Sequence, residues 1–128
     1  MADRLGQLIE SRDLEQLAAI FADDSVVWHN FSQHDQTKTE NLAGLAILFK
    51  IFAKVRYTNV KRISTTVGFV EQHILEGTTA DGDIVEMPSC MVVAVRGGQI
   101  VKLDEYIDPA PFFALIPDHT RSPFKHGD

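Results

Sequence analysis

The chain has 128 residues, of which 45% are hydrophobic and 23% are charged, and its formal net charge is −6. This length allows one globular domain with a real core and is too short for two. The acidic balance argues against nucleic acid as a partner, no apolar run is long enough to cross a bilayer, and the first residues lack the basic and apolar regions of a signal peptide.

Two short helices are predicted at the start of the chain. The first covers residues 3–11, and the second begins after Asp13, which has the spacing of an N-cap with Gln16 as its capping-box partner. The second helix is followed by a strand that runs to Phe31. The apolar faces of the two helices consist of Leu5, Leu8 and Ile9 in the first and of Leu14, Leu17, Ala18 and Phe21 in the second.

A third helix is predicted after a polar loop over residues 32–37. Thr37 and Glu40 have the spacing of a capping box at its start, and the helix runs to about Ala53. Its apolar stripe consists of Leu42, Leu45, Ala46, Phe49 and Phe52.

From Val55 onward the pattern changes to that of strands rich in Val, Ile, Thr and aromatic residues. The predicted strands are 55–63, 66–78, 84–96 and 99–107. Asp81-Gly82 and Gly97-Gly98 supply the positive φ angles that hairpin turns require. Helices followed by an antiparallel meander predict an α+β fold, in which a curved antiparallel sheet wraps around the N-terminal helices as a cone with an open mouth. The inside of such a cone is a natural ligand pocket.

The sheet is expected to end at Pro109 and Pro111, which closes a single domain at residue 116. The apolar residues that follow are expected to form a flap over the pocket or an interface patch, and residues 117–128 are expected to form a polar tail. These apolar residues are Phe112, Phe113, Leu115 and Ile116.

Glu105 is the strongest candidate for a functional group. It alternates with Leu103 and Ile107 on one face of its strand, so that face is apolar apart from the carboxyl group and is expected to lie inside. Burial raises the pKa of a carboxyl group toward neutral pH, where it can exchange protons. The alternative is a solvated Glu105 at a frayed strand end.

His73 and Glu71 share one face of their strand. His73 is either a core histidine bonded to a backbone carbonyl or a general base oriented by Glu105. Glu71 is expected near the mouth of the cone, where a solvated salt bridge is the commoner role.

Trp28 and Asn30 follow Val26 on the expected inner face of the first strand. Trp28 is either a core aromatic or a donor of its indole N–H to a ligand, and Asn30 either bonds a neighbouring loop or contacts the ligand. The same alternation points His29 away from the pocket.

These features resemble the SnoaL-like branch of the nuclear-transport-factor-2-like (NTF2-like) superfamily, which also holds ketosteroid isomerases and limonene epoxide hydrolases. The resemblance covers residues 3–116. It rests on the helical start, the Phe-Ala-Asp-Asp-Ser-Val-Val-Trp-His-Asn transition over residues 21–30, the Leu-Ala-Gly-Leu helix over 42–45, the two glycine turns and the Asp-Glu-Tyr-Ile-Asp strand over 104–108. It implies the cone fold without one chemistry, because this fold hosts isomerases, hydrolases, cyclases, dehydratases and binding modules.

The comparison with limonene epoxide hydrolases assigns residues to possible roles. Asn30 matches the asparagine that positions a water in those enzymes, and Trp28 stands at the position of their tyrosine. Glu71 and His73 stand where the arginine and first aspartate of an Asp-Arg-Asp set are found, and Glu105 stands at the second aspartate. The missing arginine argues against epoxide hydrolysis, whereas a histidine–carboxylate pair remains for proton transfer.

The sequence therefore predicts an acid/base enzyme (isomerase, cyclase, dehydratase or hydrolase) for an apolar cyclic or polyketide-, steroid- or terpenoid-like molecule, with Glu105, His73 and Asn30 as catalytic residues. The alternative is a non-catalytic ligand-binding or association module of the same fold. No cofactor and no metal are implied, since there is neither a glycine-rich nucleotide loop nor zinc spacing. The expected substrate-binding residues are Trp28, Leu45, Phe49, Phe52, Phe69, Glu71, Leu75, Met87, Ser89, Met91, Leu103, Ile107 and Phe112.

The outer face of the sheet is expected to form a homodimer, because Val70, Ile74, Val93 and Val95 would otherwise be exposed there. The single cysteine, Cys90, excludes an internal disulfide and is expected to be a small packing residue on that face. A chain without disulfides fits a reducing compartment, and a cytoplasmic location is therefore expected.

Overall fold

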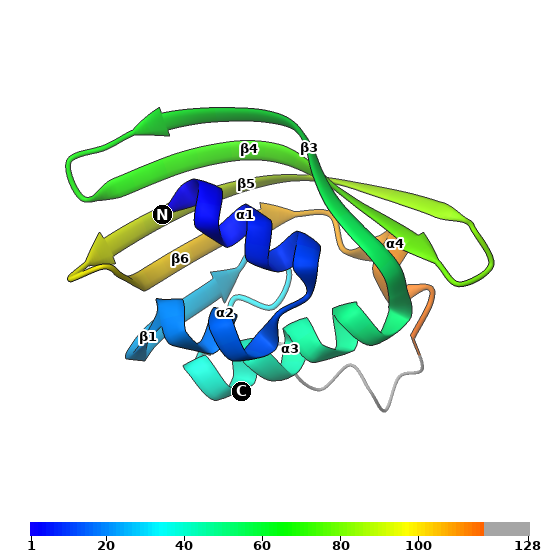
Figure 1. Cartoon of the computed structure of the whole chain (residues 1–128), viewed down its shortest axis with the longest axis horizontal. Coiled ribbons are helices and arrows are strands. Elements are labelled where there is room, and N and C mark those ends of the chain that lie inside the picture. The colour runs from blue at the N-terminus through cyan, green and yellow to red at the C-terminus, as the bar shows by residue number, and fades with distance from the viewer. Residues whose placement is uncertain (117–128) are drawn as a thin grey trace.

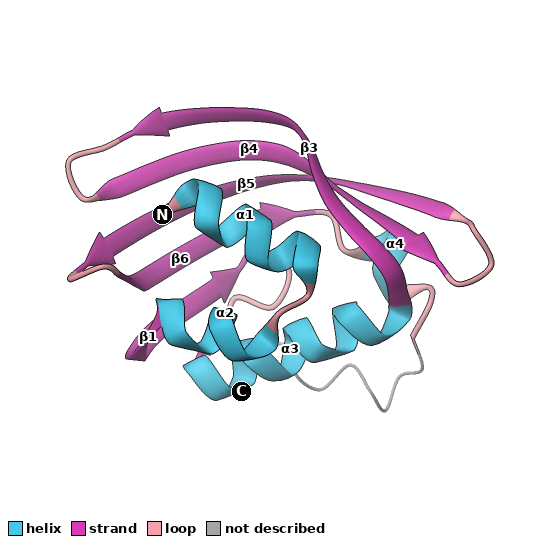
Figure 2. Ribbon diagram, viewed as in Figure 1, coloured by secondary structure: helices cyan, strands magenta, loops and turns pink. Residues whose placement is uncertain are grey.

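The computed structural model describes residues 1–116, which form one curved sheet with helices packed against a single face (Figure 1). The helices are α1 (Ala2–Ser11), α2 (Leu14–Ile20), α3 (Lys38–Ile51) and α4 (Ala110–Phe113). The strands are β1 (Phe21–His29), β2 (Asp35–Gln36), β3 (Phe52–Ser64), β4 (Gly68–Thr79), β5 (Ile84–Arg96) and β6 (Gln99–Ile107). Their order across the sheet is β2-β1-β6-β5-β4-β3. Figure 2 shows α1, α2 and α3 together on one side of these strands, so the predicted α+β cone is confirmed.

The meander from β3 to β6 follows the prediction closely, and the bounds of β5 and β6 agree with it to the residue. Its pairs are antiparallel, and Gly82, Gly97 and Gly98 have the expected positive φ angles in the turns. β1 is different because it pairs in parallel with β6, which makes the sheet mixed. Hairpin signals fix the direction of consecutive strands, whereas β1 and β6 are separated in sequence by all the intervening elements, so no local signal fixes their relative direction.

The helix starts depend on the predicted side-chain caps. The Asp13 carboxylate accepts a hydrogen bond from the backbone N–H of Gln16 at 3.0 Å. At the start of α3, Thr37 accepts from the N–H of Glu40 at 3.2 Å while the Glu40 carboxylate accepts from the N–H of Thr37 at 3.0 Å. The two helix ends differ slightly from the prediction: α2 ends at Ile20 and α3 ends at Ile51, because the chain turns extended at the next residue in each case.

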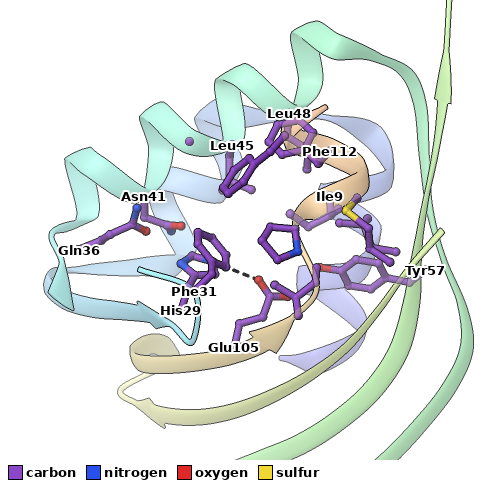
Figure 3. A pocket seen from close by; sticks show the side chains of 16 residues that line it. Ile9, His29, Phe31, Gln36, Asn41, Leu45, Leu48, Tyr57, Glu105 and Phe112 are labelled. Carbon is purple, nitrogen blue, oxygen red and sulfur yellow. Dashed lines mark ion pairs between the residues drawn. The ribbon is translucent and has the colours of Figure 1, made fainter. Parts of the chain in front are cut away.

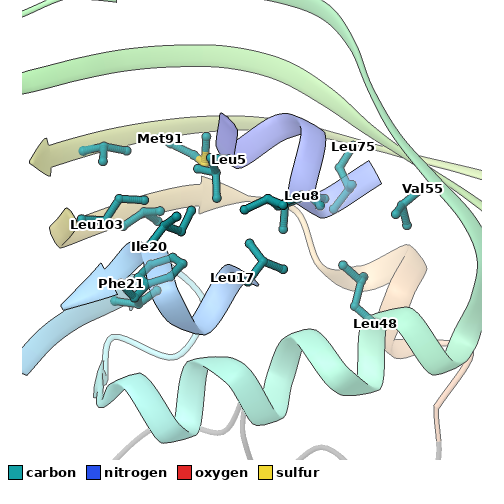
Figure 4. Packing of buried hydrophobic residues seen from close by; sticks show 14 of the residues in the cluster. Leu5, Leu8, Leu17, Ile20, Phe21, Leu48, Val55, Leu75, Met91 and Leu103 are labelled. Carbon is teal, nitrogen blue, oxygen red and sulfur yellow. The ribbon is translucent and has the colours of Figure 1, made fainter. Parts of the chain in front are cut away.

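The hydrophobic core lies between the helices and the concave face of the sheet (Figure 4). Leu8 of α1 and Leu17 of α2 point into it, and Met91 of β5 packs from the sheet. The most deeply buried residues of α3 are Asn41, Gly44 and Leu48, whereas Leu42, Leu45 and Phe49 of the predicted stripe pack against the core and stay partly exposed. This orientation of α3 places the side-chain amide of Asn41 among apolar groups, in the wall of a cavity.

A bulge in β3 brings Tyr57 and Arg62 to the same face. Arg62 follows Tyr57 by an odd number of positions along the strand, so a regular strand would place the two side chains on opposite faces. The register with β4 shifts between Thr58 and Lys61, where Asn59 has a φ of 53°. The extra residue reverses the alternation, and both Tyr57 and Arg62 contact residues of the inner face.

The outer face of the sheet carries exposed apolar groups, but not all of those predicted. Val70 and Ile74 lie there, and Cys90 is partly buried with a free thiol. The prediction for Val93 and Val95 is wrong: Val93 is 2% exposed and pairs with Leu103 on the inner face, and Val95 packs against the core after a register shift in β5.

At the end of the sheet, α4 carries the predicted apolar cluster. Phe112 and Ile116 are buried, whereas Leu115 is 40% exposed. The predicted tail, residues 117–128, lies outside the described residues. Within residues 1–116, no helix combines the length and the apolar character needed to span a membrane.

Substitutions at Asn59 test the bulge. Asn59→Val is expected to lower the free energy of unfolding by about 1–2 kcal/mol, because a β-branched residue is strained at positive φ. Asn59→Gly is expected to leave it unchanged or raised, because glycine adopts this conformation freely. Urea denaturation measures both, with Thr58→Val as the control for added valine beside the bulge. Equal stability of Asn59→Val and the wild type would contradict this account.

Candidate functional site

A cavity lies between the inner face of the sheet, α3 and α4 (Figure 3). The cavity has a volume of about 100 Å³, which is room for several waters or a small organic molecule. A neighbouring hollow of about 60 Å³ shares His29, Asn41, Tyr57 and Glu105 with it. The walls are mostly apolar, so these four polar side chains stand out as the groups that could orient a ligand.

Glu105 and His29 form the centre of the polar part. Nε2 of His29 lies 3.1 Å from Oε1 of Glu105, and the Ser89 hydroxyl donates to Oε2 at 2.7 Å. The side chain of His29 is only 13% exposed and that of Glu105 only 16%. Burial alone would raise the pKa of Glu105, but the hydrogen bond and charge of His29 and the hydrogen bond of Ser89 outweigh it and lower that pKa below its ordinary value.

The parallel pairing of β1 with β6 is what brings His29 to Glu105, since the two residues are partners in the register. Asn30 fixes this end of the pairing. Its backbone N–H donates to the carbonyl of Glu105 at 3.1 Å, and its side-chain Oδ1 accepts from the N–H of Ile107 at 2.9 Å. Asn30 is therefore engaged by the backbone and does not line the cavity, in contrast to the predicted catalytic position.

The hydrogen bonds define which atom of the pair remains open. An ionised carboxylate only accepts hydrogen bonds, so Nε2 of His29 carries the hydrogen in its contact with Glu105. Both carboxylate oxygens are engaged, by His29 and by Ser89. Nδ1 of His29 is buried and has no hydrogen-bond partner within residues 1–116. In its neutral form, an imidazole held in this way presents the lone pair of Nδ1 as a proton acceptor.

Tyr57 and Asn41 are two further polar groups of the wall, which also includes Gln36. Burial, followed by the negative charges of Glu105 and Glu71, raises the pKa of Tyr57 well above its ordinary value, so its hydroxyl stays protonated at neutral pH. Figure 3 shows Tyr57 and Glu105 lining the same hollow. Asn41 is 7% exposed, and its buried amide nitrogen has no partner within the described part of the chain. Both groups can donate a hydrogen bond to a ligand oxygen.

His73 and Glu71 form a second histidine–carboxylate pair away from the cavity. Nδ1 of His73 lies 2.7 Å from Oε2 of Glu71, and Nε of Arg62 donates to Oε1 at 2.8 Å. The predicted pairing of His73 with Glu105 is therefore wrong, because His73 meets the carboxylate two residues before it on the same strand face. The predicted solvated position of Glu71 is also wrong, since Glu71 is 1% exposed.

The predicted inner face of β1 is reversed. Trp28 lies on the outer side, where its ring meets the edge of Tyr106 with centroids 5.3 Å apart, and His29 points inward instead. The prediction counted the alternation from Val26, which is only partly buried, whereas its neighbour Val27 is 2% exposed and shares the inner face with His29. Trp28 is accordingly not part of the cavity wall.

The other predicted substrate-binding residues divide into three groups. Leu45, Leu75, Met87, Ile107 and Phe112 line the cavity. Met91 and Leu103 line the neighbouring hollow. Phe49, Phe52, Phe69, Glu71 and Ser89 line neither: Phe52 and Phe69 are core residues, and Ser89 acts through its bond to Glu105.

The sequence interpretation missed the wall residues His29, Asn41 and Tyr57. Asn41 lies four and seven residues before Leu45 and Leu48 on α3, a spacing that marks one helix face. Tyr57 alternates with the buried Val55. No local signal marks His29.

Within residues 1–116, no three His, Cys, Asp or Glu side chains are grouped in a way that could hold a metal ion.

Comparisons with known proteins agree with this architecture. No known family model matches the sequence, and no curated protein matches it. A solved protein from Catenulispora acidiphila, described as having a ketosteroid isomerase-like fold and bound to trimethylamine, superposes with a TM-score of 0.71 over 86% of each chain at 14% identity. The chain has the NTF2-like fold.

Two further solved structures with the NTF2-like fold are described as candidate polyketide cyclases. Wild-type IdmH from Streptomyces antibioticus has a TM-score of 0.73 and 20% identity, over 87% of this chain and 91% of that one. A SnoaL-like protein from Shewanella putrefaciens has a TM-score of 0.71 and 10% identity, over 89% and 91%. The predicted resemblance is confirmed at the level of the fold, which by itself fixes no reaction.

The lowered pKa of Glu105 predicts a pH dependence of stability. A carboxyl group whose pKa is lower in the folded state stabilises that state above its ordinary pKa of 4.5, and this contribution is lost as the pH falls through the folded-state value. The difference in unfolding free energy between the wild type and Glu105→Gln is therefore expected to shrink between about pH 6 and about pH 3. Urea denaturation measures it, with Asp104→Asn on the opposite strand face as the control. A difference that stays constant over this range would contradict the assignment.

Proposed function

We propose that the protein binds a small, largely apolar molecule in the cavity beside Glu105 and moves a proton on it. The reaction is that of a cofactor-independent isomerase, cyclase or dehydratase, in which a proton leaves a carbon next to a carbonyl group. The observation that carries this proposal is the Glu105–His29 pair in the wall of an otherwise apolar cavity. A histidine oriented by a carboxylate is a common acid/base unit.

Each polar group then has a separate task. Glu105 holds the hydrogen of His29 Nε2 and stabilises the imidazolium that forms when Nδ1 takes up a proton. Ser89 keeps the carboxylate in place. The Tyr57 hydroxyl and the Asn41 amide donate to the carbonyl oxygen, on which negative charge grows as the proton leaves. The same unit could take a proton from water, which is the hydrolase version of the proposal.

The similar structures are consistent with proton removal from carbon. Two of them are described as candidate polyketide cyclases, and closing a carbon ring by carbonyl chemistry begins by removing such a proton. A non-catalytic binding module is the second candidate. It is favoured by the fact that both oxygens of Glu105 already have protein partners.

Exchange of protons next to carbonyl groups distinguishes the two candidates. The wild type is expected to accelerate hydrogen–deuterium exchange at these positions of 1-tetralone or cyclohexanone in D₂O, measured by NMR. Glu105→Gln and His29→Gln are each expected to lower this rate by about 10²-fold or more, because a positioned acid/base group contributes that much. Asp104→Asn is the control and should leave the rate unchanged. Binding of the ketones without any acceleration by the wild type would favour the binding module.

The proposal includes a homodimer that covers the outer face of the sheet. Val92 is 44% exposed and Tyr106 is 51% exposed on that face, and Ile63 at its β3 edge is 70% exposed. Apolar groups that share one face of a sheet are more stable against a partner than in water. A second copy of the same face is the simplest partner, because an isologous contact needs no other chain.

Val92→Lys is expected to shift the protein toward the monomer, because it places a charge within the proposed contact. Sedimentation equilibrium measures the dissociation constant, which should rise by at least about 10-fold. Val67→Lys, at the exposed β3–β4 turn, is the matched control and should leave the association unchanged. A wild type that is monomeric at high concentration would overturn this part of the proposal.

A further inference from the structure

A line of four charged or ionisable side chains runs from the surface into the core beside the cavity. Asp3 on α1 is exposed, and its carboxylate accepts a hydrogen bond from Nη1 of Arg62 at 2.7 Å. Arg62 donates to Glu71 at 2.8 Å, and Glu71 contacts Nδ1 of His73 at 2.7 Å. Exposure falls along this line to 1% at Glu71 and 0% at the His73 side chain.

This line is not required for packing. Glu71 and His73 lie between Phe69 and Leu75 on an inner strand face that is otherwise apolar, and apolar residues of similar size would fill the same space. Replacing a buried ion pair by well-packed hydrophobic residues is often neutral or stabilising. Packing alone therefore does not account for Glu71 and His73 at these positions. The residue that His73 contacts in the wall of the cavity suggests another role for the pair.

That residue is Tyr57. The His73 and Tyr57 rings are stacked, with centroids 3.7 Å apart and an angle of 15° between their planes. Tyr57 lines both hollows of the site. Its backbone N–H donates to Glu10 of α1 at 3.2 Å, so the residue is held from the helix side as well. The bulge at Asn59 brings Tyr57 and Arg62 to this same face.

We propose that His73 is a positioning residue for Tyr57. Arg62 fixes Glu71, Glu71 fixes the orientation of the His73 ring, and this ring holds the Tyr57 phenol where its hydroxyl donates to the ligand oxygen beside Glu105. The inference rests on the proposed ligand site, and it assigns a task to the buried pair that the acid/base step does not use. It also predicts a preference for ligands with an oxygen over hydrocarbons of the same shape.

Binding of 2-naphthol and of naphthalene measures this preference, because the two molecules differ by one hydroxyl group. Fluorescence titration of the full chain is expected to give tighter binding of 2-naphthol. The affinity ratio is the affinity for 2-naphthol divided by that for naphthalene. Tyr57→Phe should reduce this ratio roughly 3- to 10-fold, which corresponds to the loss of one hydrogen bond. His73→Phe keeps an aromatic ring but loses the bond to Glu71, and Arg62→Met removes the outer anchor. Each should reduce the ratio roughly 3-fold or more, while naphthalene affinity stays unchanged.

Two controls separate positioning from a general loss of structure. Arg56 lies on β3, like Arg62, and forms a surface ion pair with Glu76 of β4. Arg56→Met removes this pair and should leave the ratio of the two affinities unchanged. In the Tyr57→Phe background, His73→Phe should have no further effect on the ratio, because the hydroxyl that it positions is absent. Full effects of His73→Phe in that background, or none in the wild type, would overturn the inference while the proposed site stands.

A readout without ligand keeps the inference separate from the proposed function. The chain has two tyrosines, so ¹³C-labelled tyrosine in a Tyr106→Phe background reports on Tyr57 alone. Ring motion of Tyr57 measured by NMR relaxation is expected to increase in His73→Leu and Arg62→Met and to stay unchanged in Arg56→Met. An unchanged Tyr57 ring in both variants overturns the positioning role. Failure of the wild type to bind either naphthalene compound would instead count against the ligand site, and the ring measurement would still decide the inference.

Discussion

The site depends on keeping two carboxylates ionised inside an apolar sheet face. Glu71 and Glu105 lie in one row across the sheet, as the two partners of Met91 on either side. Burial alone would raise the pKa of both, yet hydrogen bonds and charges from His73 and Arg62 in one case and from His29 and Ser89 in the other lower it. Each buried carboxylate is tolerated because both of its oxygens are engaged.

This constraint explains why the irregular features of the backbone lie where they do. The parallel pairing of β1 with β6 places His29 opposite Glu105, and the bulge in β3 turns Arg62 inward beside Glu71. Without the bulge, Arg62 would face outward and Glu71 would lack this basic partner. The cost of a positive φ at Asn59 is thus linked to the burial of Glu71, several residues away in sequence and adjacent in the sheet.

The sequence predicted the features that depend on local chemistry. The caps at Asp13 and Thr37 and the glycine turns that set β5 and β6 need only neighbouring residues, and the inward direction of Glu105 follows from alternation counted over a regular strand. It failed in β1, where two adjacent valines allow either alternation and the structure buries Val27 rather than Val26. Trp28 and His29 exchanged faces for this reason, and no glycine marks the bulge at Asn59. The pairing of β1 with β6 is a contact between the two ends of the fold, which local patterns do not encode.

The two histidine–carboxylate pairs differ in what their second imidazole nitrogen can reach. Each histidine uses one nitrogen on its carboxylate and leaves the other without a hydrogen-bond partner within residues 1–116. His29 does so as a residue of the cavity wall, where the proposed ligand binds. His73 has its ring covered by Tyr57, which leaves it no contact with the cavity except through that phenol. Similar chemistry at two places in one sheet is therefore the basis of two different proposed tasks, proton transfer for His29 and the placing of a hydrogen-bond donor for His73.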